Sequence, residues 1–360
     1  MAVESPLPAI APARPATIDA EIHNVVSNTE ALFPYLSEHW RESITQTLFK
    51  GAVDAAFPRN APTTARPNSG PPGVTPGSSL SYLQANVLDP MNVETAILAC
   101  TYAVDSLRNP DAAIAFASAI NDWQIAEWLD RDSRLRASIV VPSQLPADAA
   151  REIERVGDHP GFVQVLMPVR SHQPYGNRNY HEMFGAVARK DLVAGIHFGG
   201  HPGNPPTPSG WPSHYVEEYI DMAGVFASQV TSIITEGVFD QYPTLRVALL
   251  EAGFTWIPAH MWRFDKEWRN LRRLVPWVRR SPSSYIREHI RVTVQPLDAP
   301  TDPRMLLGII EQLECDEMLM YASDFPHLHR FDAEADLLTH LPTSLATKIR
   351  RDNARSFYRL

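Results

Sequence analysis

The sequence predicts a (β/α)8 barrel, an α/β fold, on three observations. Eight short runs rich in apolar or β-branched residues follow one another along the 360 residues. Segments with helical spacing separate most of these runs, and strands that alternate with helices are typical of a parallel sheet. An open doubly wound sheet would need a glycine-rich phosphate-binding turn after an early strand, and the sequence has none.

The expected strands are the eight runs themselves, and each gap between them supplies one crossover, as a right-handed βαβ unit requires. They cover residues 17–23, 93–99, 134–141, 161–167, 192–198, 245–251, 289–295 and 317–323. Apolar residues at helical spacing predict helices over 111–130, 146–156, 180–190 and 214–241. Asp111, directly after Pro110, marks the start of the first of these helices.

We expect a single barrel domain over residues 17–360. Residues 1–16 are rich in Ala and Pro but have neither a basic leader nor a continuous apolar core, so they predict a disordered lead-in rather than a signal peptide. Residues 59–79 are rich in Pro, Gly, Ser and Thr and predict an insertion at the rim of the barrel. A lid over the site and a loop without a role are both open interpretations of this insertion.

Composition and charge exclude several classes of protein. Hydrophobic residues make up 44% and charged residues 20%, which is typical of a globular enzyme. The net charge of −9 argues against a nucleic-acid partner. No segment of ~20 apolar residues offers a membrane span. Cys100 and Cys315 are too few for a disulfide framework and suit reduced thiols, so we expect a cytoplasmic protein.

Ionisable side chains stand at the ends of four expected strands. Glu21 and His23 are two residues apart on the first strand, so both point to the same face. His197, Glu251 and Asp324 stand at the ends of the fifth, sixth and eighth strands. In a barrel these ends meet at one catalytic rim. Burying such groups together without a cation would be costly, and carboxylates with imidazoles suit zinc or manganese.

Several spaced motifs carry a family resemblance over nearly the whole chain, from Thr17 to Tyr358. Together they resemble the amidohydrolase-related family, which includes the decarboxylases of aminocarboxymuconate semialdehyde and of ortho-hydroxybenzoates such as γ-resorcylate. The motifs are IDAEIH at 18–23, GIHF at 195–198, EGVFDQYPTLRVALLEAGF at 236–254, YASDFPH at 321–327 and NARSFY at 353–358.

The resemblance implies the ligands of one divalent ion. The family's first-strand motif falls on Glu21 and His23, with Glu in the first place as in the resorcylate branch; its fifth-strand His falls on His197 and its eighth-strand Asp on Asp324. The ion so implied is zinc, with manganese as the alternative. Many decarboxylase members place a catalytic His where this chain has Glu251, and this departure puts a direct transfer of their mechanism in doubt.

Two reactions and one non-enzymatic role follow from this set. In non-oxidative decarboxylation of a small aromatic or unsaturated carboxylic acid, Asp324 would handle the proton that replaces carbon dioxide. In the alternative, hydrolysis of a lactone, ester or amide, the ion would lower the pKa of a bound water toward ~7, and Asp324 or Glu251 would take its proton. The third role is an inactive barrel that binds a small molecule. His327 is a candidate substrate contact or a local packing residue, and His329 is expected at the surface.

The expected partner is a small molecule, a carboxylic acid or a lactone. The Arg-rich stretch 266–291, with Trp268 and Trp277, could be a nucleic-acid patch, but the acidic total favours an exposed helix with subunit contacts. A homodimer is therefore a further expectation.

Overall fold

The computed structural model describes residues 14–52, 65–200, 203–300, 302 and 304–360. Its eight strands form one parallel sheet in the order β1-β2-β3-β4-β5-β6-β7-β8. The strands are β1 Thr17–Ile22, β2 Val93–Leu98, β3 Leu135–Val140, β4 Phe162–Pro168, β5 Val193–His197, β6 Arg246–Leu250, β7 Ile290–Thr293 and β8 Leu319–Met320. Each lies within, or within one residue of, a predicted run, so the prediction of eight strands is confirmed.

Backbone hydrogen bonds between the two outermost strands close the sheet into a barrel. The Ala20 N–H donates to Tyr321 O at 2.9 Å, and the Asp324 N–H donates to Glu21 O at 3.1 Å. The His23 N–H donates to Phe325 O at 2.7 Å. These bonds run from β1 to β8 and the residues just after it. The predicted (β/α)8 barrel is therefore confirmed, and the strand ends that carry the ionisable residues meet around one axis.

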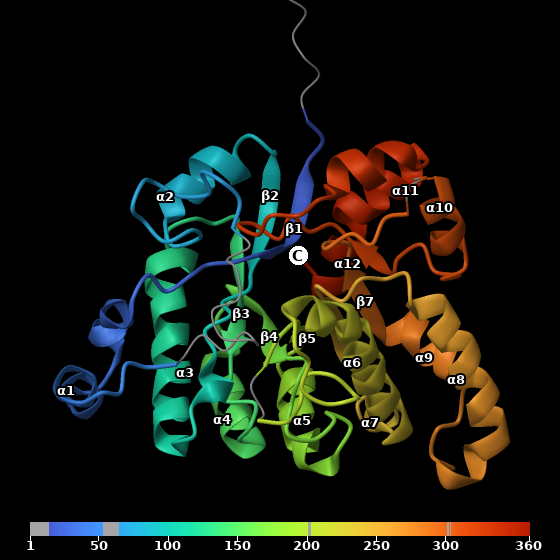
Figure 1. Cartoon of the computed structure of the whole chain (residues 1–360), viewed down its shortest axis with the longest axis horizontal. Helices are drawn as coiled ribbons and strands as arrows, with labels where there is room; N and C mark the ends of the chain where they lie inside the picture. The colour runs from blue at the N-terminus through green and yellow to red at the C-terminus, as the bar shows by residue number, and fades with distance from the viewer. Residues whose placement is uncertain (1–13, 53–64, 201–202, 301, 303) are drawn as a thin grey trace, which may run out of the picture.

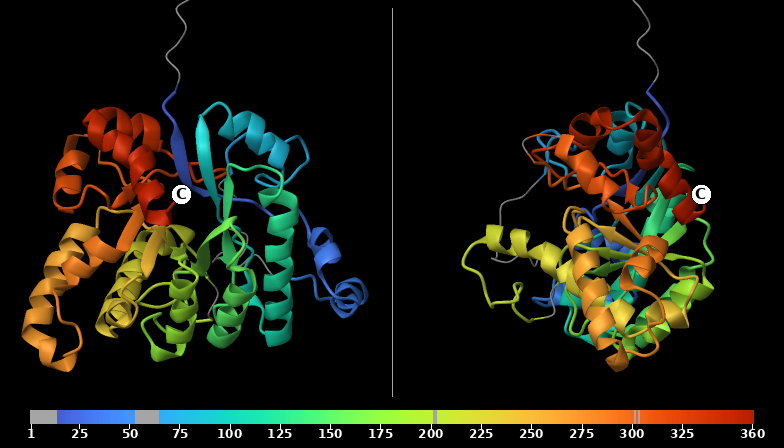
Figure 2. Two further views of the ribbon diagram at one scale, coloured as in Figure 1. Left: turned by 180° about the vertical axis from the view of Figure 1, so that it is seen from behind. Right: turned by 90° about the vertical axis from the view of Figure 1, so that its right-hand side faces the viewer.

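Helices surround the barrel on the outside (Figures 1 and 2). The predicted helix 111–130 is α3, which continues as a π-helical turn over Ile125–Leu129, and Asn109 caps its first turn by accepting from the Asp111 and Ala112 N–H groups. The α-helices are α1 Glu38–Gln46, α2 Leu80–Leu83, α3 Pro110–Gln124, α4 Pro146–Val156, α5 His181–Arg189, α6 Tyr215–Thr235, α7 Val238–Gln241, α8 Ile257–Leu271, α9 Pro282–His289, α10 Arg304–Glu311, α11 Thr343–Thr347 and α12 Asn353–Tyr358. No helix in the described ranges is long and apolar enough to cross a membrane.

The described residues form two hydrophobic cores. The larger lies between the barrel and its helices, and the smaller one draws side chains from β1, β2, β4, β5, β6 and β8 together with α12, so it fills the barrel interior. α12 contributes Phe357 and Tyr358 to this smaller core, and the Tyr358 hydroxyl donates to Gln164 Oε1, near the start of β4, at 2.7 Å. The C-terminal helix thus seals the N-terminal end of the barrel and leaves the opposite end open for a site.

The described part of the predicted rim insertion lies beside the end of β8. Ala65 bridges to His327, and the Arg66 N–H donates to Pro326 O at 2.8 Å. The Arg66 side chain also donates to the carbonyls of His327 at 2.7 Å and Ser323 at 2.8 Å. This segment therefore braces the backbone on both sides of Asp324. Residues 1–13 of the expected lead-in and 59–64 of the expected insertion lie outside the described residues.

Candidate metal centre

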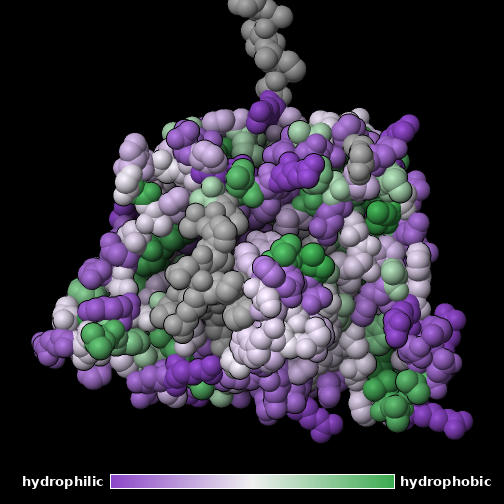
Figure 3. Space-filling model, viewed as in Figure 1, coloured by the Kyte–Doolittle hydropathy of each residue, from purple (hydrophilic) through white to green (hydrophobic). Residues whose placement is uncertain are grey.

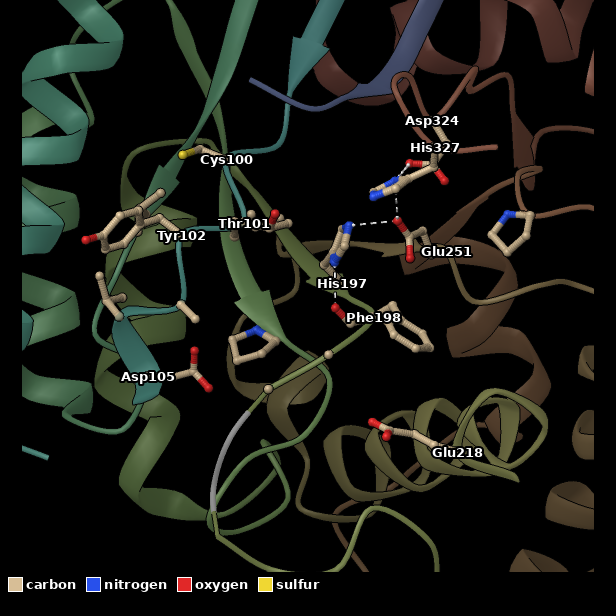
Figure 4. Close-up of a pocket in the computed structure, with 18 of the residues that line it drawn as sticks. Cys100, Thr101, Tyr102, Asp105, His197, Phe198, Glu218, Glu251, Asp324 and His327 are labelled. Atoms are coloured by element: carbon tan, nitrogen blue, oxygen red, sulfur yellow. Dashed lines mark hydrogen bonds and ion pairs between the residues drawn. The ribbon is translucent and has the colours of Figure 1, made fainter. Parts of the chain in front are cut away.

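All six side chains predicted from the sequence gather at the C-terminal end of the barrel. Figure 4 shows His197, Glu251, Asp324 and His327. They form two overlapping groups, and within each group one ligand atom from every member lies within 4.8 Å of the others. The first group is Glu21, His23, His197 and Glu251, and the second is His23, Glu251, Asp324 and His327. The structure therefore brings together residues that are up to 306 positions apart, Glu21 and His327, in one small space.

A β-bulge aims the first two of these side chains. The pairing of β1 with β2 shifts register between Asp19 and Ile22. Ala20 packs inside the barrel, and strict alternation would then turn Glu21 outward. The bulge breaks this alternation, so Ile22 packs outward while Glu21 and His23 both face the site. The prediction that these two residues share a face is right, and the bulge, which was not predicted, decides that this face is the one toward the site.

The residues after β6 and β8 have left-handed backbones. Glu251 has φ 57° and Asp324 has φ 54°, although neither is glycine. Each such conformation costs about 1–3 kcal/mol and is found mainly at functional sites. Its effect here is to turn both carboxylates off the strand direction and toward the barrel axis. Hydrogen bonds from the Glu251 N–H to Thr293 Oγ1 at 3.2 Å and from the Asp324 N–H to Glu21 O hold the two turns in place.

Both central imidazoles are oriented by backbone carbonyls. His23 Nδ1 lies 2.8 Å from Ala99 O, and His197 Nδ1 lies 2.7 Å from Phe198 O. A carbonyl can only accept, so each Nδ1 carries its proton and each Nε2 points into the cluster. Metal-ligating histidines are usually held in this way, with one ring nitrogen donating to a carbonyl and the other free for the ion.

Two buried atoms in the cluster lack a hydrogen-bond partner. Glu21 Oε1 and His197 Nε2 lie 3.1 Å apart, yet neither makes a hydrogen bond. The other oxygen of Glu21, Oε2, accepts from Thr293 Oγ1 at 2.9 Å. Burying such atoms without a partner is costly. Both atoms have lone pairs that can bind a metal, so a cation placed between them would remove this cost.

Glu251 lies between the imidazoles. Its Oε1 is 3.3 Å from His197 Nε2 and 3.4 Å from His23 Nε2. The same oxygen is 3.6 Å from His327 Nδ1. This position suits a base that works next to the ion, which is the role expected for Glu251 in hydrolysis, and it also suits a ligand.

Asp324 is held by three histidines. Its Oδ1 lies 2.9 Å from His23 Nε2 and 3.0 Å from His327 Nδ1, and its Oδ2 lies 2.6 Å from His329 Nε2. The expectation that His329 lies at the surface is wrong, because only 16% of its side chain is exposed and it contacts the carboxylate directly. The sequence offered one signal for this contact, the short spacing of five residues from Asp324.

The protonation of the cluster shows that it needs positive charge. Burial opposes the charged form of His23, but hydrogen bonds to Asp324 and Glu251 raise its pKa to about 10. Burial likewise opposes the charge on His197, and Glu251 and Glu21 hold its pKa well above the usual value. Protonated imidazoles thus stand in for a cation among the carboxylates. A divalent ion on the same Nε2 atoms would replace these protons, so the donor set fits the expected ion.

The pKa values of the three carboxyl groups in the cluster shift in different directions. Burial raises the pKa of Glu21 above its ordinary value. Burial also opposes ionisation of Glu251, but His197 and His23 outweigh it and lower its pKa to about 2. In the same way the hydrogen bonds from His23 and the two later histidines hold the pKa of Asp324 well below its usual range against burial. Asp324 and Glu251 are therefore anionic at neutral pH, beside two imidazoles.

A cavity of about 240 Å³ opens from this cluster. Its wall includes aromatic and apolar side chains that sequence reasoning did not select, because their spacing resembles that of ordinary core residues. None of its described lining residues is Lys or Arg. Besides His197, Glu251, Asp324 and the two later histidines, the wall contains Tyr102, Val104, Asp105, Val140, Val141, Leu166, Pro168, Phe198, Tyr215, Glu218, Tyr219 and Pro296.

Comparison with known proteins agrees with this geometry. The sequence model described as Amidohydrolase matches residues 18–360. The chain belongs to the amidohydrolase family. Among curated proteins it is 27% identical over 328 residues to the γ-resorcylate decarboxylase of Rhodococcus jostii, covering 80% of this chain and 93% of the relative. The γ-resorcylate decarboxylase of a Rhizobium species is 26% identical over 321 residues, with the same coverage.

Solved structures share the fold of this amidohydrolase. A dihydroxybenzoic acid decarboxylase from a Polaromonas species, with bound manganese and 2-nitroresorcinol, has a TM-score of 0.64 at 21% identity and covers 96% of this chain and 97% of its own. The manganese complex of 5-carboxyvanillate decarboxylase from Novosphingobium aromaticivorans has a TM-score of 0.70 at 19% identity, with 96% of each chain covered. The fold is therefore that of an amidohydrolase over nearly its whole length.

Proposed function

We propose that this amidohydrolase catalyses the metal-dependent, non-oxidative decarboxylation of a small aromatic or unsaturated carboxylic acid. The observation that carries the proposal is the buried cluster of carboxylates and imidazoles that opens into a pocket lined by aromatic rings. The activity named for the curated relatives supports the same reaction class. The aromatic wall suits the flat face of a ring substrate.

Four side chains would hold the ion, namely Glu21, His23, His197 and Asp324. The orphaned Glu21 Oε1 and His197 Nε2 and the carbonyl-oriented imidazoles support this assignment. When bound, a divalent ion supplies a Lewis acid that polarises a carboxylate and a neighbouring oxygen. Zinc remains the predicted ion and manganese the alternative, since the donor set suits both.

The protein's part in the reaction is to deliver one proton. Protonation of the ring carbon weakens its bond to the carboxylate, the bonding electrons return to the ring, and carbon dioxide leaves. Asp324 is the group proposed to pass on this proton, because its Oδ1 lies in the cluster, 2.9 Å from His23 Nε2. Since Asp324 is anionic at neutral pH, it must first take up the proton that it gives. His327 Nδ1, at 3.0 Å from Asp324 Oδ1, would resupply it, and its side chain is 33% exposed and so can exchange protons with solvent.

Hydrolysis remains the second candidate because of one specific observation. Glu251 replaces the catalytic histidine of many decarboxylase members, and its carboxylate joins those of Glu21 and Asp324 in the cluster. The described wall of the pocket offers no Lys or Arg to offset these charges. A site of this kind repels a substrate carboxylate and favours a carboxylate base that takes a proton from water, with a neutral lactone or ester as the substrate.

A product screen separates the two reactions. Metal-replete protein would be supplied with ortho-hydroxybenzoates, with release of carbon dioxide as the readout, and with lactones, with acid release as the readout. Asp324→Asn serves as the inactive comparison. Carbon dioxide release by the wild type alone supports decarboxylation, and acid release alone supports hydrolysis. Silence on both panels with metal bound would remove both reaction classes.

A homodimer is a further part of the proposal. Apolar side chains gather at the free end of α8 and just beyond it (Figure 3), where Leu271 is 53% exposed, Leu274 is 70% exposed and Trp277 is 42% exposed. Such a patch suits a subunit contact. Light scattering that reports a monomer would end this part. Location in the cytoplasm also stays a prediction, and it is supported by the two free cysteines.

A further inference from the structure

Glu218 is a buried acidic residue that the proposed chemistry does not use. It lies in the first turn of α6, next to exposed Glu217, yet only 3% of its surface is accessible. It lines the pocket, and Figure 4 shows its carboxylate directed into that space, on the far side of Phe198 from Glu251 and Asp324. One of its oxygens, Oε2, has no hydrogen-bond partner.

An arginine holds the other oxygen. Arg170 Nη1 lies 3.2 Å from Glu218 Oε1, and Arg170 Nη2 donates to Asn204 O at 3.1 Å. Both side chains of this pair are more than nine-tenths buried. The guanidinium therefore holds Glu218 through Oε1 and leaves Oε2 as an unused acceptor. A buried unpaired acceptor costs about 1–3 kcal/mol. A ligand that donates a hydrogen bond to Oε2 removes this cost and therefore binds more tightly.

The charge around this acceptor is negative on balance. Asp105 lines the same pocket, and its charge, like that of Glu218, acts on Arg170. The guanidinium of Arg170 thus interacts with two carboxylates. A neutral or cationic hydrogen-bond donor is attracted to such a place, whereas a second carboxylate or a sulfonate is repelled.

We infer that Glu218, held by Arg170, is a specificity-determining residue that selects ligands with a hydrogen-bond donor, a hydroxyl or an amino group, on the side of the ring that faces away from the cluster. The inference deepens the proposed function, on which its choice of an aromatic ligand rests. A methoxy group at the same place has no proton to give and leaves Oε2 buried without a partner. Sites built around a buried polar group reject analogues that lack its counterpart.

Binding of phenols tests this inference without relying on turnover, because phenols have no carboxylate to lose. The probes are resorcinol, 3-aminophenol and 3-methoxyphenol, together with hydroquinone, 4-aminophenol and 4-methoxyphenol. Dissociation constants would be measured by calorimetry on metal-replete protein. In at least one of the two series we expect the hydroxyl and amino compounds to bind roughly tenfold more tightly than the methoxy compound.

Two variants sharpen the result. Glu218→Gln preserves the shape and can still accept from Arg170, but it removes the charge, and we expect the preference to fall below roughly threefold. Glu236→Gln, at the exposed C-cap of the same helix, should keep the wild-type preference. Thermal melting of each variant verifies that it is folded. If a variant does not fold, the comparison of the ligands on the wild-type protein still tests the inference.

The outcomes separate this inference from the reaction class. Equal binding of all three compounds in both series by the wild type would overturn it, as would the absence of any phenol binding or an unchanged preference in folded Glu218→Gln. A preference that Glu218→Gln removes, in protein that releases no carbon dioxide from any hydroxybenzoate, would uphold the role of Glu218 and remove decarboxylation. Carbon dioxide release without a preference for hydroxyl and amino compounds would uphold decarboxylation and remove the role of Glu218.

Discussion

The two ends of the barrel bury polar groups in opposite ways. At the N-terminal end, the Gln164 amide is satisfied on both sides, since its Nε2 donates to Ser138 Oγ at 2.8 Å and its Oε1 accepts from Tyr358 at 2.7 Å. At the C-terminal end, Glu21 Oε1 and His197 Nε2 are buried without partners. At the closed end the Gln164 amide is paired, although Arg246 Nε there is buried without a partner. At the open end the unpaired atoms are those proposed to hold an ion.

The two ends of the barrel also differ in what they contribute to the stability of the fold. Buried carboxylates and protonated imidazoles without a cation cost stability, whereas the α12 seal adds apolar burial. Substitutions at the open end should therefore change activity and metal binding far more than stability. Substitutions at the closed end should do the opposite.

The largest effect should come from Asp324→Asn. An amide can neither carry the proposed proton nor bind the ion as an anion, so we expect kcat/KM to fall by roughly 10³-fold or more. The fold should persist, because the change removes one negative charge from a crowded anionic cluster. Initial rates of product formation and a thermal melt are the two measurements. Asp316→Asn, an exposed acid paired with Lys348, is the matched control and should keep full activity.

The next effect is the pH dependence of metal affinity. In the metal-free protein the pKa of His23 is about 10, so its Nε2 carries a proton at neutral pH. The ion must displace this proton, and affinity should therefore rise with pH, roughly tenfold per unit for His23 alone between pH 6.5 and 9. The sign of this pH dependence follows from the raised pKa, because below that pH the proton competes with the ion for His23 Nε2. Titrations at buffered free-ion activity would measure this slope, and an affinity that is flat over that range would show that His23 is not displaced by the ion.

Stabilisation by the ion should be smaller. At a free-ion concentration a hundred times the dissociation constant, binding contributes about 2.7 kcal/mol to the free energy of unfolding. His197→Ala should abolish the corresponding rise in melting temperature, while His340→Ala, at an exposed histidine, should keep it. A full shift in His197→Ala would place the ion elsewhere.

The smallest effect should come from the closed end. Tyr358→Phe removes the hydrogen bond to Gln164 and leaves a buried acceptor, which costs about 1–3 kcal/mol of stability. Activity should stay within roughly twofold of the wild type, because no contact to the cluster is lost. Denaturant unfolding and kcat/KM provide the two numbers. Loss of activity without loss of stability would contradict the division between the ends.

Much of the fold was predictable because the strands are short runs rich in apolar or β-branched residues, and four of these runs carry an ionisable residue at or near the end. The residues at those ends, such as His197 and Asp324, could be selected because barrel geometry brings strand ends together. The bulge before Ile22 and the left-handed backbone at Glu251 could not be predicted. They arise from pairing between strands and leave no periodic signal in the sequence.

The residues missed in the site were missed for other reasons. Glu218 follows Glu217 at the start of a helix, a pattern that is typical of an exposed N-terminal turn. The contact with Arg170, 48 residues earlier, holds it in its buried position. His329 was missed because its spacing of five residues from Asp324 is only a weak signal that the loop after the strand folds back onto this carboxylate. A long-range ion pair such as that of Arg170 with Glu218 is set by tertiary packing rather than by local sequence.

The central claim is that the open end of the barrel holds one divalent ion. Anomalous diffraction at the metal absorption edge from crystals of metal-replete protein tests it most directly. We predict one peak per chain, about 2.0–2.3 Å from Glu21, His23, His197 and Asp324 for zinc. No peak, a second peak beside the first, or a peak away from these four side chains would contradict the account.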